Sequence, residues 1–134
     1  MILSVDFENT MPIYMQIYEQ IVLAISSGNL SPGEALPSVR SLSADIGVNI
    51  HTVNKSYAIL RDEGYLSMSH RSGATVSRTM PDKAKILPAM EDRLRQLSAQ
   101  AAVHGVEQAE FVKMAQTAYS EVISINQRGD NLHG

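Results

Sequence analysis

The side chains best suited to chemistry in this chain are polar, and they gather in one part of it. Asn54 carries an amide that can pair with both the donor and the acceptor on the edge of adenine. Lys55, the next residue, carries a positive charge that suits a phosphate. His51 and Thr52 lie just before them and suit a phosphate or a base edge. This combination indicates recognition of double-stranded DNA.

Two further groups of residues could complete such an interface. Ser38 is a good helix N-cap, and Arg40 after it could lie over a phosphate. His70, Arg71 and the backbone near Gly73 could reach a neighbouring minor groove or its phosphates. The predicted DNA-binding set is therefore Ser38, Arg40, His51, Thr52, Asn54, Lys55, His70, Arg71 and Gly73.

The residues around this set predict two short helices joined by a glycine turn. Ser38 should cap a helix that runs through Ile46, where Gly47 breaks it and can adopt a left-handed backbone. Asn49 should cap a second helix that runs to about Glu63. The pair forms a helix-turn-helix, whose second helix enters the major groove.

A hairpin is expected directly after these helices. The segments Tyr65–Ser69 and Ala74–Ser77 bracket a loop of about four residues that contains a glycine, which is typical of two paired strands. A hairpin at this position makes the module a winged helix-turn-helix. A lone asparagine on a helix surface usually has no function, so Asn54 gains weight only from this context. Arg61, Asp62 and Glu63 are interpreted as a solvated helix end.

Several short motifs occur in order between residues 10 and 77. They are Pro12-Ile13-Tyr14-x-Gln16-Ile17, Gly28-Asn29-Leu30-x-Pro32-Gly33, Leu36-Pro37-Ser38-x-Arg40-x-Leu42, Thr52-Val53, Leu60-x-x-Glu63-Gly64 and Gly73-x-Thr75-Val76. This pattern resembles the GntR family of bacterial transcription regulators, and the short tail that follows is similar to the YtrA subfamily. The resemblance implies a homodimer on a palindromic operator, usually a repressor and often one that controls genes for ABC-type transporters.

The resemblance also implies roles for individual residues. The family's arginine after the Leu-Pro-Ser motif falls on Arg40, its recognition-helix contacts fall on His51, Thr52 and Asn54, and its wing contacts fall on His70, Arg71 and Gly73. The chain departs from the family where Ile50 and Asn54 stand at positions that are often arginine. Arg71 stands where many members have a second wing glycine. With fewer arginines, affinity should depend more strongly on dimerisation.

Two amphipathic helices are predicted after the hairpin. Their apolar residues recur at steps of three and four, which is typical of a helix packing against a partner. The residues predicted to mediate dimerisation are Leu87, Met90, Leu94, Leu97 and Ala101 on the first helix, and Phe111, Ala115, Tyr119 and Val122 on the second. Two such helices are too short to enclose a typical ligand cavity. The residues identify no small-molecule effector, and one would have to act at the dimer interface or beside the DNA-binding domain.

The net charge of −3 does not by itself favour a nucleic acid as partner. The distribution is more informative, because residues 36–80 hold five Lys or Arg against three Asp or Glu. We therefore expect a small basic face on an acidic body. A winged-helix protein that serves as a protein–protein adaptor, without specific DNA binding, is the alternative that the acidic total supports.

Other classes of protein lack support. The histidines (His51, His70, His104 and His133) are scattered, no glycine-rich phosphate loop follows a strand, and no cysteine is present, so we expect neither an enzyme nor a metal or other cofactor. No segment predicts a signal peptide or a membrane helix. The expected location is the cytoplasm, in association with the nucleoid.

The predicted fold class is α+β and mostly helical. A winged helix-turn-helix domain should occupy residues 1–78, followed by a linker over 79–86. A two-helix dimerisation region should cover 87–127, and a flexible tail 128–134. The predicted function is a sequence-specific DNA-binding transcriptional regulator.

Overall fold

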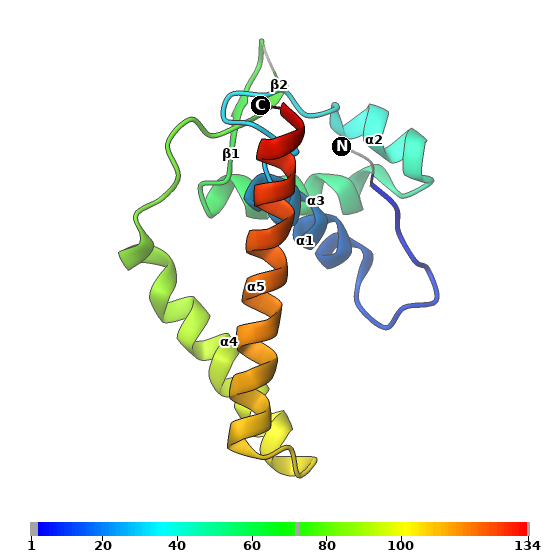
Figure 1. Cartoon of the computed structure of the whole chain (residues 1–134). Helices are drawn as coiled ribbons and strands as arrows, with labels where there is room; N and C mark the ends of the chain where they lie inside the picture. Colours follow the sequence, from blue (N-terminus) through cyan, green and yellow to red (C-terminus); the bar gives the residue numbers. More distant parts are fainter. Residues whose placement is uncertain (1–2, 72, 134) are drawn as a thin grey trace.

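The computed structural model describes residues 3–71 and 73–133, with side chains described as far as Ile123. The elements are α1 (Ile13–Ser26), α2 (Val39–Ile46), α3 (Ile50–Asp62), β1 (Leu66–Ser69), β2 (Gly73–Val76), α4 (Lys83–Val103) and α5 (Gln108–His133). The first three helices and the hairpin form one packed unit, from which α4 and α5 project (Figure 1). The predicted fold class, α+β and mostly helical, is confirmed.

Local signals form the helix-turn-helix as predicted. The Ser38 hydroxyl accepts a hydrogen bond of 3.0 Å from the Ser41 backbone N–H at the start of α2. The Asn49 side chain accepts one of 2.8 Å from the His51 backbone N–H at the start of α3. Gly47, between the helices, has a φ of 70°, which a side chain with a Cβ rarely adopts. These three residues therefore fix where each helix begins and how the chain turns.

The core of the N-terminal unit lies between α1, α3 and the hairpin. Ile17, Ile21, Val53, Tyr57 and Leu60 are completely buried there. Burial of this apolar surface supplies the main stabilisation of the unit. The core therefore holds α3 by one face and leaves its opposite face free.

The hairpin is antiparallel, and its register pairs Leu66 with Val76 and Ser69 with Gly73. Leu66, Ala74 and Val76 are buried, so one face of the hairpin packs on the core. The strands differ from the predicted ones by one residue at several ends, and Gly73 belongs to β2 rather than to the loop. The loop itself projects beyond the helices (Figure 1).

The connection to the tail is shorter than predicted. The helix α4 begins at Lys83, whereas the predicted linker covered 79–86. The polar residues 82–85 indicated a linker, but the Asp82 side chain accepts a hydrogen bond of 3.0 Å from the Ala84 backbone N–H and caps the helix at this point. Pro88 is accommodated within α4.

The last helix, α5, is longer than predicted. The predicted two-helix region ends at residue 127 and is followed by a flexible tail over 128–134, but helical backbone continues to His133. Gly134 lies outside the described residues. From the turn near Gly105 the two helices α4 and α5 diverge, and α5 runs back towards the N-terminal unit, where it approaches α1 (Figure 1).

Candidate nucleic-acid interface

The first turns of α2 and α3 lie next to each other and form an open hollow of about 390 Å³. Its lining includes four residues of the predicted DNA-binding set, which are Ser38, Arg40, His51 and Asn54. All four are exposed. Both helices begin beside this hollow, and the dipole of a helix N-terminus favours a negatively charged ligand. The structure therefore places Ser38 and Arg40, at the start of α2, around the same hollow as His51 and Asn54 of α3.

Thr52 and Lys55 differ in their accessibility. Thr52 is half-buried, whereas Lys55 is exposed and its ammonium Nζ lies 3.9 Å from the centroid of the Tyr14 ring. An ammonium over an aromatic face is attracted by the ring quadrupole. The Ser56 hydroxyl donates a hydrogen bond to the Tyr14 carbonyl, so α1 and α3 are also joined directly beside this pair.

The contact of Tyr14 with Lys55 was not predicted from the sequence, where Tyr14 stands only within the motif that begins at Pro12. No local signal could have revealed the contact, because it depends on how α1 packs against α3. The result is that Lys55 is positioned by a ring from another helix instead of extending freely into solvent.

The wing residues are accessible, and they come from a different element. His70 and Arg71 are exposed in the hairpin loop, and Gly73 is exposed with a φ of 66°. The loop projects away from the core (Figure 1), whereas the hollow is lined by residues at the N-termini of α2 and α3. The predicted set therefore forms two groups, one at the helix N-termini and one in the wing.

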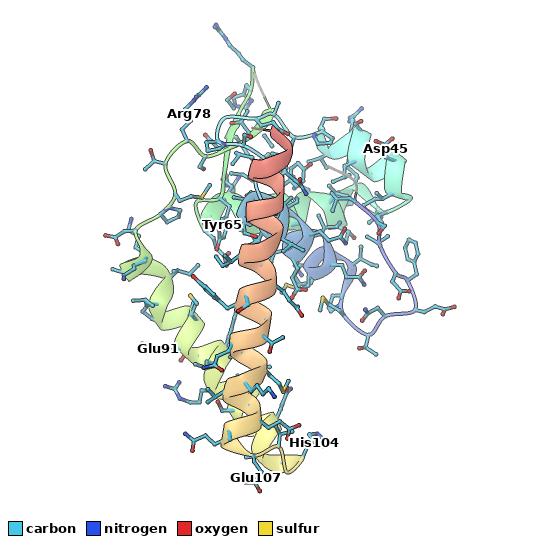
Figure 2. The ribbon with its side chains drawn as sticks, in the orientation of Figure 1. Asp45, Tyr65, Arg78, Glu91, His104 and Glu107 are labelled. Atoms are coloured by element: carbon cyan, nitrogen blue, oxygen red, sulfur yellow. The ribbon has the colours of Figure 1, made fainter. Side chains whose placement is uncertain are left out.

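Arg78 was also missed. It lines an open hollow of about 590 Å³ together with hydroxyl residues from the hairpin and the segment after it, namely Ser67, Thr75, Ser77 and Thr79. A Cβ placed on Gly33 would lie 2.9 Å from the Arg78 Cζ atom, so the arginine folds against this turn because Gly33 has no side chain. Figure 2 labels Arg78 on the same side of the molecule as the hairpin.

The acidic residues of α3 lie away from its polar N-terminus. Asp62 and Glu63 are at its C-terminal end, and a helix of 13 residues is about 19 Å long. Asp62 pairs with Arg61 at 3.1 Å in solvent, as the prediction of a solvated helix end implies. Glu63 is exposed too, and its carboxylate also accepts a hydrogen bond from the Tyr18 hydroxyl, which the sequence did not predict. The acids of α3 are therefore separated along the helix from its polar N-terminus.

Tyr57 connects the core to the start of α2. Its ring is fully buried and its hydroxyl donates a hydrogen bond of 2.8 Å to the Pro37 carbonyl. Burial raises the pKa of Tyr57 to about 12, so the hydroxyl stays protonated at neutral pH. This bond holds the segment that precedes Ser38 and Arg40 in place.

The apolar residues of the tail remain largely uncovered in the single chain. Leu87, Met90, Leu94 and Leu97 are 42–53% exposed, and with Glu91 and Arg93 they line a groove of about 370 Å³ along α4. Ala101, Phe111 and Val122 are half-buried, whereas Ala115 and Tyr119 are exposed. We call the four residues Leu87, Met90, Leu94 and Leu97 the α4 seam.

Within the described residues, no helix is long and apolar enough to span a membrane. Over the same part of the chain, no group of three or more histidine, aspartate or glutamate side chains is placed to hold a metal ion.

A helix-turn-helix with two capped helix N-termini, followed by a projecting hairpin, defines a winged-helix DNA-binding protein. Residues 13–76 match the profile described as "Bacterial regulatory proteins, gntR family". The chain is also 33% identical over 108 residues to the HTH-type transcriptional repressor YtrA of Bacillus subtilis, across 78% of this chain and 82% of that protein. The chain belongs to the GntR family, as a YtrA-like member, and is a DNA-binding transcriptional regulator rather than an enzyme.

Solved structures extend the likeness beyond the N-terminal unit. A transcriptional antiterminator from Listeria monocytogenes EGD-e is 25% identical and superposes with a TM-score of 0.83 over 92% of this chain and 93% of that one. The AraR DNA-binding domain in complex with operator ORX1 is 29% identical, with a TM-score of 0.52 over 56% of this chain and 96% of that one. Some other family members are much longer, since the match to PdxR of Corynebacterium glutamicum spans 46% of this chain and 14% of that protein.

Proposed function

We propose that this protein is a homodimeric repressor that binds a palindromic operator. The observation that carries the proposal is the half-exposed α4 seam behind a polar, doubly capped helix-turn-helix. In a monomer, four large apolar side chains remain in contact with water, which is unfavourable. A second copy of the chain could cover them. Two copies related by two-fold symmetry would present two recognition helices to a two-fold DNA site.

The exposed residues of α3 are proposed to read the DNA. The Asn54 amide has the donor and acceptor needed for a bidentate contact to adenine, and it lies at the edge of the hollow between α2 and α3. His51 and Thr52 serve as additional contacts to a base edge or a phosphate, with Thr52 limited by its partial burial. These residues would supply sequence preference.

Affinity is proposed to come from the cations and the wing. Arg40 in the hollow and Lys55 beside the Tyr14 ring would contact phosphates. The Ser38 side chain already caps α2, so its contribution would be to orient that helix N-terminus towards the backbone. His70, Arg71 and the Gly73 backbone would contact the neighbouring minor groove or its phosphates.

The dimer is proposed to form through both tail helices. The α4 seam would pack on the partner, with Ala101, Phe111, Ala115, Tyr119 and Val122 at its border. Linking two DNA-binding units raises their effective concentration on a palindrome. This gain would compensate for the small number of base-reading cations on α3.

The sign of regulation and the target genes are inferred from the relatives. The B. subtilis relative YtrA is named a transcriptional repressor, and we propose the same sign for this protein. We extend the proposal to genes for transporters, which the resemblance to the YtrA subfamily implies. The site of action would be the chromosome in the cytoplasm. The proposal requires no small-molecule effector.

The test is selection of bound duplexes from a random pool, followed by a salt titration of the selected duplex. We expect a palindrome to be enriched and to survive competitor DNA. The logarithm of its association constant should fall linearly with the logarithm of the salt concentration, because phosphate contacts release counterions. If no duplex is enriched and no pool is bound, the protein–protein adaptor becomes the better explanation.

A further inference from the structure

The joint between the DNA-binding unit and α4 is closely packed. Pro81, in the connection between them, lies directly against Gly64 at the end of α3. A Cβ on Gly64 would be only 2.5 Å from the Pro81 Cγ atom, and the φ of Gly64 is 90°. Both the space and the backbone conformation therefore require glycine at this position. The connection cannot move away from α3 without losing this contact.

A cluster of polar and aromatic side chains lies at the same joint, and we call it the joint cluster. It consists of Tyr18 on α1, Glu63 and Tyr65 at the two sides of Gly64, and Arg93 on α4. The Tyr18 hydroxyl donates a hydrogen bond to the Glu63 carboxylate. The Tyr18 and Tyr65 rings meet edge to face, with centroids 6.4 Å apart and planes at 84°.

Arg93 is the member of the joint cluster that α4 contributes. Its guanidinium carbon lies 6.0 Å from the centroid of the Tyr18 ring, within the range of a cation–π contact. The Glu63 carboxylate, bound to the same tyrosine, adds an opposite charge nearby. Arg93 also lines the groove of the α4 seam, so one side chain contacts both the joint and the proposed dimer face.

The Tyr18 hydroxyl of the joint cluster stays protonated at neutral pH. Burial and the hydrogen bond to Glu63 raise the pKa of Tyr18 to about 12. The interaction with Tyr18 is the largest cause that raises the pKa of Arg93 above its usual value. The cluster therefore holds a neutral phenol between a cation and an anion.

Small movements at this joint would have large effects at the far end of α4. With 21 residues, α4 is about 30 Å long, so a tilt of about 10° at its base moves its other end by about 5 Å. One base-pair step along DNA is about 3.4 Å. The orientation of α4 relative to α3 would consequently determine how far apart two recognition helices lie in a dimer.

We propose that Arg93, through the Tyr18 ring, fixes α4 relative to the recognition helix and so sets the half-site spacing that the dimer accepts. Arg93 is thus a positioning residue with no DNA contact of its own. The inference rests on the proposed function, because spacing has meaning only for a dimer on a two-fold site.

The experiment uses the selected palindrome with its two half-sites moved together or apart by single base pairs. Each change shifts and rotates one half-site, so we expect the wild-type dimer to lose about tenfold or more in affinity per step. Arg93→Met should bind the best spacing about two- to fivefold more weakly, as loss of an exposed cation–π contact implies. Its preference among spacings should fall to about threefold or less, measured at a protein concentration where its mass is that of a dimer, while the affinity for one half-site stays unchanged.

Matched variants separate this role from general effects on α4. Arg95 lies on the same helix but pairs with Asp92 at 2.9 Å in solvent, so Arg95→Met should keep the wild-type spacing profile. Arg93→Lys keeps the cation and should retain most of the preference. Two results would overturn this inference and leave the proposed function standing. One is an Arg93→Met variant with the spacing preference of the wild type. The other is a wild-type dimer that binds a half-site but shows no preference among spacings. Loss of dimerisation or of half-site binding by the wild type would instead overturn the proposed function.

Discussion

The ammonium of Lys55 on the recognition helix lies 3.9 Å from the centroid of the Tyr14 ring on α1. The contact crosses from the supporting helix to the proposed DNA-binding surface. It reduces the freedom of a long side chain before any DNA is present, and a preorganised cation loses less entropy on binding. We therefore propose that Tyr14 positions Lys55 for its phosphate contact.

Tyr14→Leu should weaken binding to every DNA sequence by about two- to fivefold, because the ring that holds Lys55 is lost. Tyr14→Phe keeps the ring face and should bind as the wild type does. Binding isotherms on specific and unrelated duplexes measure both effects, with thermal unfolding as a check on folding. Equal affinities for Tyr14→Leu and the wild type would show that Lys55 needs no support.

Asn54→Ala should relax the base preference at one operator position and cost about 1–3 kcal/mol on the selected palindrome. Lys55→Ala should weaken all sequences alike and reduce the salt slope by about one. The measurement is affinity across a set of operators with single base changes. Identical behaviour of the two variants would remove the base-reading role of Asn54.

Leu94→Glu should produce a monomer, because the charge would be buried in the proposed interface without a partner. Leu94 is 52% exposed in the single chain, and Leu23 on α1 is 45% exposed. Leu23→Glu is therefore a matched control that should leave the dimer intact. Light scattering gives the mass, and affinity for the palindrome should fall about 100-fold with loss of the second linked site. An unchanged mass for Leu94→Glu would contradict the dimer interface.

Stability should fall as pH rises from about 10 to about 12, because Tyr57 has a pKa of about 12 in the folded protein and 10.0 as its ordinary value. The folded state holds the proton more tightly, so its stabilisation is complete below pH 10 and is lost as pH approaches the folded value. The two-unit difference corresponds to about 2–3 kcal/mol. Denaturant unfolding of Tyr57→Phe across this range should show a shallower decline than the wild type. If the stability of Tyr57→Phe declines as steeply as that of the wild type, the loss of stability at high pH comes from other groups.

Features governed by short-range chemistry were predictable from the sequence. Ser38, Asn49 and Gly47 each act within three residues of their own position, so the helix-turn-helix followed directly from them. The start of α4 was misplaced because polar residues suit a linker and a helix alike, and the Asp82 cap decided between them.

Contacts between distant segments were not predictable. Tyr18 and Glu63 are 45 positions apart in the sequence. Nothing in the residues next to Glu63 distinguishes it from a surface glutamate that has no hydrogen-bond partner in the protein. The contact of Arg93 with Tyr18 likewise depends on how the connection folds against Gly64. The sequence therefore indicated which residues could contact DNA but not the packing that positions them.

We propose above all that two copies of this chain bind one two-fold operator. The most direct measurement is the mass of the complex formed on the selected palindrome, compared with the affinity for a duplex that holds a single half-site. We expect two chains per palindrome and an affinity about 100-fold or more above that for the half-site. One chain per palindrome, with equal affinities for the two duplexes, would contradict it.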